Sequence, residues 1–176
     1  MTATRRETAS RQLADAIRIY HVAFEAVDDV ACEYMGINRT DLRCLDILGR
    51  AGPMSAGRLA EESKLTNAAV TVVLDRMEQA GYMRRVRDTV DRRRVMVEAT
   101  PKAHKRAWAL YGKIAERLGE QLERYSDEEL ELLRDFLQAR TGIDLQVAAE
   151  FRKRRIPRPR ETRRGNVSRA RAAVRR

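Results

Sequence analysis

Apolar residues recur along this chain at the spacing of amphipathic helices, and the first such stripe is long. It predicts a helix over about 8–34, and its members are Leu13, Ile17, Tyr20, Phe24, Val27, Ala31 and Tyr34. Gly36 ends the pattern. Asn38 is a favoured N-cap residue, so a second helix is expected to begin there and to stop at 49–53.

Two shorter helices are expected next. Ser55 begins the first of them, and Thr66 is placed to cap the second, which runs to Ala80. Gly81 stands where a left-handed residue commonly ends a helix. Four apolar side chains of the second helix are expected to face the core, namely Val70, Val73, Leu74 and Met77.

The period then changes from that of a helix to that of a strand. The segments 82–86 and 94–98 are short and β-prone, and the polar stretch 87–93 between them predicts a β-hairpin. Thr100-Pro101 restarts a helix, whose apolar face extends to Tyr125. Ser126 and Glu129 have the spacing of a capping box. The last helix that they open is expected to end near 141–142, with a further short helical segment over 143–151.

Three short helices followed by a hairpin predict a mainly α fold with a small β-hairpin, a winged helix-turn-helix flanked by long N- and C-terminal helices. The apolar stripes of these long helices exceed what the central module can cover. We therefore expect a homodimer that buries them, although a compact monomer with its end helices folded back is the alternative. One domain is expected over 1–150, with the helix-turn-helix and wing at about 38–100, and a basic tail over 151–176.

The net charge of +10 is unevenly distributed. Residues 151–176 hold 12 basic and one acidic residue, a net of +11, whereas the first 150 residues hold 24 basic and 25 acidic residues. A claim of DNA binding by the body therefore needs local evidence. The hairpin supplies it, because 82–97 contains six arginines and two aspartates. The tail either adds phosphate contacts of no sequence preference or is a disordered end that aids solubility.

Several classes of function are not supported by the residues present. The chain has two cysteines, Cys32 and Cys44, and two histidines, so no metal-site spacing, cofactor motif or catalytic set is visible. We expect no enzyme, metal or cofactor, although a thiol-based redox sensor stays open. A secretory signal and an apolar run of membrane-spanning length are not visible, so we expect a cytoplasmic protein without a membrane partner.

The second helix of a helix-turn-helix pair is the one that enters the major groove of double-stranded DNA. With its core face assigned, the residues left on or near the outer face have short side chains and are Asn67, Ala68, Thr71, Val72 and Asp75. Asn67 can pair with an adenine edge, whereas Ala68, Val72 and the Thr71 methyl group can contact thymine methyl groups. Arg76 and Arg85 are better suited to phosphates. An ordinary solvated helix surface is the alternative.

A wider set of residues forms a recognisable pattern. It comprises Leu59-Ala60, Leu65-Thr66, Thr71, Asp75-Arg76-Met77-Glu78, Gly81-Tyr82, Arg85, the wing Asp91-Arg92-Arg93 with Val95 and Val97, and Thr100-Pro101-Lys102. This pattern resembles that of the multiple antibiotic resistance regulator (MarR) family of bacterial transcription factors, over roughly 37–137. The chain departs from the family where Ala103 replaces the usual Gly and where the arginine-rich tail extends past the usual end.

The resemblance implies a sequence-specific regulator, most simply a repressor, that binds a pseudo-palindromic operator as a homodimer. It implies that Thr66 and the helix it caps contact DNA, and that Arg93 reaches the minor groove while Asp91 steadies the loop. Arg92 or Arg94 can share the role of Arg93. A winged-helix protein-interaction module is the rival class, but it predicts a wing without arginine.

The resemblance also implies a small-molecule effector, bound where the dimerising helices meet the DNA-binding module. The candidate wall residues are Tyr20, Phe24, Arg43 and Trp108, which combine aromatic surface with one charge. The alternative for each of them is a place in the core or the dimer seam.

Overall fold

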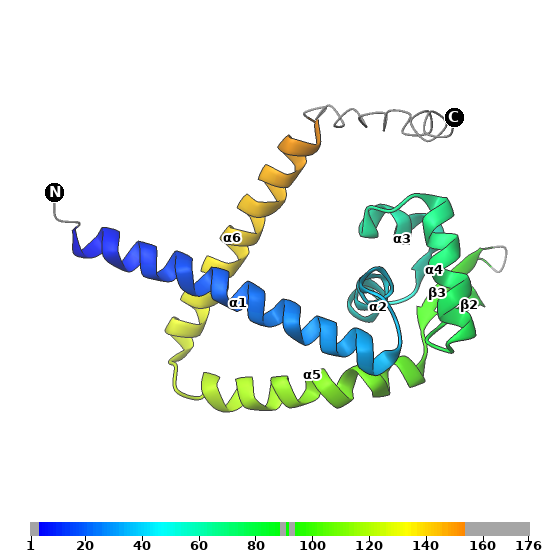
Figure 1. The fold of residues 1–176 in the computed structure, drawn as a ribbon, viewed down its shortest axis with the longest axis horizontal. Coiled ribbons are helices and arrows are strands. Elements are labelled where there is room, and N and C mark those ends of the chain that lie inside the picture. The colour runs from blue at the N-terminus through cyan, green and yellow to red at the C-terminus, as the bar shows by residue number, and fades with distance from the viewer. Residues whose placement is uncertain (1–3, 89–90, 92–93, 154–176) are drawn as a thin grey trace, which may run out of the picture. The chain divides into compact units, whose positions relative to one another are not determined.

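The computed structural model describes residues 4–88, 91 and 94–153, and within them the chain is mainly helical with a small antiparallel sheet. This confirms the fold class expected from the sequence (Figure 1). The elements in chain order are α1 (Arg5–Met35), α2 (Arg39–Ala51), β1 (Met54–Ser55), α3 (Ala56–Ser63), α4 (Asn67–Gln79), β2 (Met83–Arg87), β3 (Val95–Ala99), α5 (Pro101–Leu122) and α6 (Asp127–Lys153).

The helices begin at the polar residues that the sequence indicated. Asn38, Ser55, Thr66 and Ser126 each accept a hydrogen bond from the backbone N–H three residues on. These bonds satisfy N–H groups that a helix start otherwise leaves unpaired. Only α1 begins earlier than expected, because Thr4 forms a capping box with Glu7.

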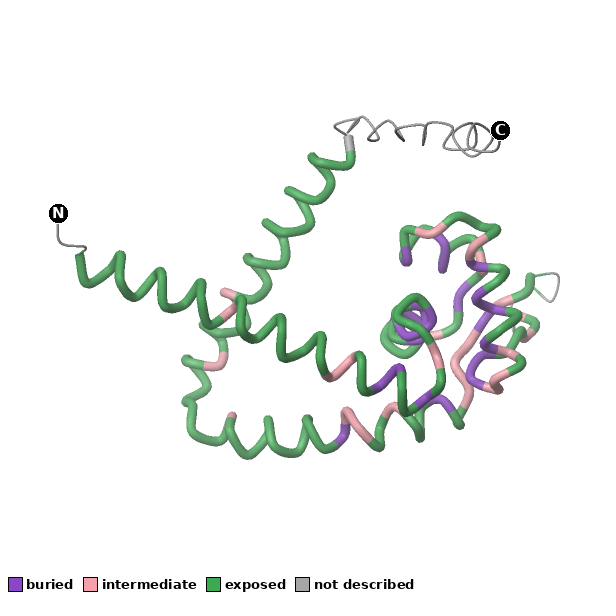
Figure 2. Tube along the Cα trace, viewed as in Figure 1, coloured by how far each residue is buried: buried purple, intermediate pink, exposed green. Residues whose placement is uncertain are grey.

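Most of the buried core lies inside the winged helix-turn-helix module, as Figure 2 shows by the purple positions. Its largest fully buried side chains include Leu59, Leu74, Met77 and Met83, which come from α3, α4 and β2. Burial of such apolar side chains is the main favourable term in folding. The packed core therefore holds the exposed residues of the module in a fixed arrangement.

The sheet has the strand order β1-β3-β2 with antiparallel pairing. Met83 pairs with Ala99 and Arg87 with Val95, so the two hairpin strands each begin one residue later than the sequence pattern indicated. The short strand β1 was not predicted, because two residues carry no periodicity. Its residue Met54 pairs with Val97 and is buried, which fastens the hairpin to the helices.

The chain forms two compact units, Met1–Gln121 and Leu122–Arg176. The expected domain boundary near residue 150 stays a prediction, because 154–176 lie outside the described residues. The expected end of the last helix near 141–142 is wrong: α6 runs without a break to Lys153. None of the helices in the described part of the chain has the length and apolar content needed to cross a membrane.

Candidate nucleic-acid interface

Helix α4 has one buried face and one short-chained exposed face. Val70, Val73, Leu74 and Met77 are buried, as the sequence predicted. The opposite face exposes Asn67, Ala68, Thr71 and Val72, so the residues expected to contact bases are all accessible. The Thr71 hydroxyl donates to the carbonyl of Asn67 at 3.0 Å, which leaves its methyl group as an apolar contact surface. Thr66 caps the helix by accepting from Ala69 N–H at 3.2 Å.

Arg76 is engaged within the chain. Its Nη2 and Nε atoms donate to the two carboxylate oxygens of Asp41 at 2.5 Å and 3.0 Å. The Asp41 side chain is 1% exposed, whereas that of Arg76 is 46% exposed. The hydrogen bond to Asp41 raises the pKa of Arg76. This ion pair joins the start of α2 to the last turns of α4, and the expected phosphate contact of Arg76 stays a prediction.

Arg85 on β2 is also paired within the chain. Its guanidinium contacts the carboxylates of Asp75, at 2.9 Å, and Glu78, and its N–H donates to Glu78 at 2.8 Å. The hydrogen bond to Asp75 raises the pKa of Arg85. These contacts fix the hairpin against α4. The guanidinium of Arg85 is thus already paired with two carboxylates, and its expected phosphate contact stays a prediction.

The wing keeps other cations exposed. Arg87 and Arg94 are exposed, and in the described residues no carboxylate pairs with either guanidinium. Arg94 N–H donates to the carbonyl of Asp91 at 2.8 Å. The predicted minor-groove residues Arg92 and Arg93 lie outside the described residues. Arg87 was not singled out from the sequence, although its position before the tip was visible.

The turn between α3 and α4 carries a further exposed cation. Lys64 has a left-handed backbone with φ of 58°, and it is the non-glycine residue with positive φ in the described part of the chain. This conformation closes α3, because the Lys64 N–H donates to the carbonyl of Glu61. Sequence reasoning did not single it out, because a lysine gives no turn signal.

A cavity of about 630 Å³ lies beside α2, between α1 and α5. Phe24 and Arg43 are among its lining residues, as expected, whereas Tyr20 and Trp108 are not. Tyr20 is 62% exposed and packs on Phe24, with ring centroids 6.0 Å apart. Trp108 is 67% exposed and lies over Gly112 of its own helix. A role for these four residues in ligand binding stays a prediction.

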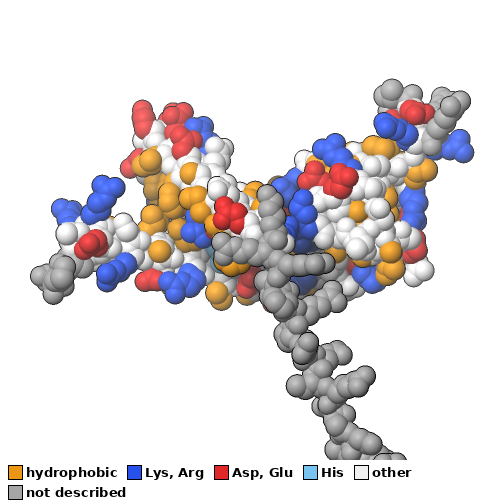
Figure 3. Space-filling view, turned by 90° about the horizontal axis from the view of Figure 1, so that it is seen from above, with side chains coloured by type: hydrophobic (Ala, Val, Ile, Leu, Met, Phe, Trp, Pro, Cys, Tyr) orange, Lys and Arg blue, Asp and Glu red, His pale blue; other side chains and the backbone are white. Residues whose placement is uncertain are grey.

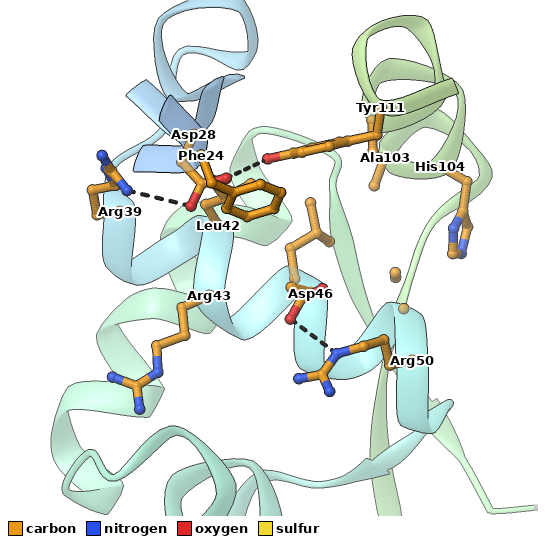
Figure 4. Close-up of a pocket in the computed structure, with 14 residues that line it drawn as sticks. Phe24, Asp28, Arg39, Leu42, Arg43, Asp46, Arg50, Ala103, His104 and Tyr111 are labelled. Atoms are coloured by element: carbon orange, nitrogen blue, oxygen red, sulfur yellow. Dashed lines mark hydrogen bonds and ion pairs between the residues drawn. The ribbon is translucent and has the colours of Figure 1, made fainter. Parts of the chain in front are cut away.

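The cavity also contains a polar network that the sequence did not reveal. Figure 4 shows Asp28 between Tyr111 and Arg39. The Tyr111 hydroxyl donates to Asp28 Oδ1 at 2.8 Å, and Arg39 Nη1 donates to Asp28 Oδ2 at 3.3 Å. The other charged lining residues include Arg43, Asp46 and Arg50. Within the described residues no cluster of side chains is suited to hold a metal ion.

Large apolar side chains remain exposed on the three long helices. They include Leu13, Ile19 and Val22 on α1, Trp108, Ile114 and Leu118 on α5, and Leu132, Leu133, Leu137, Ile143, Leu145 and Phe151 on α6. Figure 3 shows hydrophobic side chains, in orange, at the surface of the protein. Exposed apolar surface of this extent is typical of an interaction surface.

Comparisons with known proteins agree with this architecture. The model of the MarR family matches residues 37–95. YcgE of Bacillus subtilis, named as an uncharacterized HTH-type transcriptional regulator, is 35% identical over 127 residues, 72% of this chain and 78% of YcgE.

Two solved structures share the fold. One is a MepR mutant from a multidrug resistant S. aureus clinical isolate, with a TM-score of 0.60 and 19% identity over 74% of this chain and 95% of that one. The other is NadR in complex with 4-hydroxyphenylacetate, with a TM-score of 0.51 and 22% identity over 79% of this chain and 96% of that one.

Proposed function

Because this chain belongs to the MarR family of DNA-binding transcriptional regulators, we propose that it is a homodimeric repressor that binds a pseudo-palindromic operator and responds to a small-molecule effector. The observation that carries the proposal is the exposed face of α4 formed by the short side chains of Asn67, Ala68, Thr71 and Val72, which lies opposite a buried face. Short side chains allow the helix to approach base edges in the major groove. Two-fold symmetry places the half-sites about one helical turn apart, and the bound dimer blocks polymerase by occupancy.

The wing and the tail divide the remaining contacts. In this proposal Arg93 enters the minor groove, with Arg92 and Arg94 close by, and reads narrow A·T-rich shape. Exposed cations such as Arg87 and Lys64 supply phosphate contacts that fix the register. The arginines of 154–176 add phosphate contacts without base preference.

The effector part of the proposal rests on the cavity beside α2. Its volume of about 630 Å³ falls in the usual range for small-molecule sites, and its wall combines Phe24 and Tyr111 with charged groups. The NadR structure contains 4-hydroxyphenylacetate, which supports a ligand-responsive fold. The thiol-based alternative is less favoured, because burial raises the pKa of both Cys32 and Cys44 and so opposes the reactive thiolate.

Selection of bound fragments from random DNA tests the operator proposal. The selected fragments are expected to share two inverted half-sites about 10 base pairs apart, centre to centre. Light scattering on the complex with one selected fragment should give two chains per duplex. Selection that enriches no common sequence, or a complex with one chain per duplex, would overturn the proposal.

Two substitutions separate shape readout from base readout. Arg93→Ala is expected to weaken binding of the selected operator about tenfold, whereas Arg117→Ala on α5 should not change it. Asn67→Ala is expected to reduce discrimination at one base pair by about tenfold. Gel-shift titrations on the operator and on single-base variants measure both effects. Equal behaviour of Arg93→Ala and Arg117→Ala would contradict the role given to the wing.

Removal of residues 152–176 tests the tail. Each phosphate contact that is lost should lower the slope of log affinity against log salt by about 0.9, while base preference stays the same. A full-length variant with glutamine in place of the tail arginines is the control for length, and it should behave like the truncation. An unchanged slope would show that the tail contacts no phosphates.

A further inference from the structure

We propose that Tyr111 and Asp28 are positioning residues whose hydrogen bond sets the orientation of α5 relative to the winged module, and thereby the separation of the two recognition helices. The inference rests on the proposed homodimer, in which α5 belongs to the dimerising part and α4 to the DNA-reading part. The Tyr111–Asp28–Arg39 bridge, named for its three members, lies where these two parts of one chain meet.

The bridge connects three helices through one carboxylate. Asp28 on α1 accepts from the Tyr111 hydroxyl on α5 and from Arg39 at the start of α2. Arg39 is itself held on α1, because it donates to Asp29 at 2.7 Å and to the carbonyl of Glu25 at 2.6 Å. The Asp28 carboxylate therefore joins α5 to α1 at the place where the start of α2 also contacts α1.

Few other contacts hold this stretch of α5 in place. Leu110 and Tyr111 pack against a small cluster of Ala31, Cys32 and Leu42. Arg106 lies over the Tyr34 ring, 4.9 Å from its centroid. Among the described residues, the bond from Tyr111 is the one side-chain hydrogen bond that joins α5 to α1. Regions with few contacts have low local stability, so we expect the removal of one contact to change the tilt of this helix.

The environment of the bridge strengthens it. The Asp28 side chain is 25% exposed, and Tyr111 is half-buried. Burial raises the pKa of Tyr111, and the hydrogen bond to Asp28 raises it further. Hydrogen bonds to a charged acceptor are about twice as strong as neutral ones.

The bridge is also accessible from the cavity, because Tyr111, Asp28 and Arg39 all line it. A molecule in the cavity can accept the hydrogen bond that the Tyr111 hydroxyl donates, or donate to Asp28 in place of Tyr111. Either event removes the restraint on α5. The same residues thus fix the orientation of α5 in the free protein and allow a molecule bound in the cavity to change that orientation.

Operator spacing provides the test. Tyr111→Phe removes the hydroxyl and keeps the ring in the apolar cluster, and Tyr34→Phe is the matched control on α1. Wild-type protein and both variants are titrated with the selected operator and with operators that have one base pair added or removed between the half-sites. Tyr111→Phe is expected to reduce the preference for the selected spacing about five- to tenfold, while Tyr34→Phe leaves it unchanged.

A second measurement does not depend on DNA. A spin label on Gln79→Cys, which is exposed at the end of α4, reports the distance between the two recognition helices of the free dimer. Tyr111→Phe and Asp28→Asn should each shift and broaden that distance distribution, and Tyr34→Phe should not. Thermal unfolding of each variant distinguishes this positioning role from a purely structural one. A purely structural role would lower the stability of the variant and leave the spacing preference and the distance unchanged.

The outcomes separate this inference from the proposed function. Wild-type protein without spacing preference and without a measurable distance between labels would overturn the homodimer itself. Wild-type protein with both properties, and Tyr111→Phe indistinguishable from Tyr34→Phe, would overturn the positioning role alone.

Discussion

Replacement of Arg76 by methionine is expected to lower the free energy of unfolding by about 3 kcal/mol. The change removes both guanidinium hydrogen bonds from Asp41, whose carboxylate is almost completely buried. In the described structure the remaining donor to that carboxylate is Asn38 N–H, at 3.2 Å. A buried charge that loses its partner keeps its desolvation cost, which is why this effect exceeds that of a surface ion pair. Chemical denaturation with a constant m-value measures it.

A matched control comes from the neighbouring strand. Arg85→Met breaks an ion pair of comparable geometry with Asp75 and Glu78, but those carboxylates are more exposed, so the expected cost is below about 1 kcal/mol. Addition of Asp41→Asn to Arg76→Met should restore about 1 kcal/mol, because the buried charge is then absent. Equal destabilisation by Arg76→Met and Arg85→Met would show that Arg76 does not compensate a buried charge.

Features that depend on local sequence were predicted correctly. The caps at Asn38, Ser55 and Thr66 and the buried face of α4 follow from neighbouring residues, because capping and helical periodicity act over three to four positions. The exposed face of α4 followed from the same periodicity. The continuation of α6 past Gly142 was missed, because one glycine costs only about 1 kcal/mol in a helix. The Arg140–Asp144 ion pair spans that position.

Features that depend on distant residues were not visible. Arg76 and Asp41 are 35 positions apart, so the pattern placed Arg76 on an outer surface without showing its partner. Tyr111 and Asp28 are 83 positions apart, and each fits an amphipathic helix on its own. Tyr20 belongs to the same stripe as Phe24, yet only Phe24 lines the cavity. Periodicity assigns a side chain to a face of a helix, whereas tertiary packing decides what that face meets.

We expect a second copy of this chain to cover the exposed apolar face of α6. Leu130, Leu133 and Leu137 lie at three- and four-residue spacing, so they share one side of the helix. Leu137 is 58% exposed, a large apolar area that a dimer would remove from water. In the proposed operator reading, recognition of both half-sites needs this association, because each chain carries one recognition helix.

Leu137→Glu is therefore expected to yield monomers and to weaken operator binding by about a hundredfold or more. In the dimer, binding of one half-site holds the second recognition helix close to the other half-site, and a monomer loses this effect. Gln146→Glu adds the same charge on the opposite side of α6, where Gln146 is exposed, and should leave the dimer intact. Sedimentation measures the mass of each variant, and titration of one isolated half-site shows whether each recognition helix still works. Leu137→Glu that remains dimeric and binds the full operator like Gln146→Glu would contradict the assignment of this face.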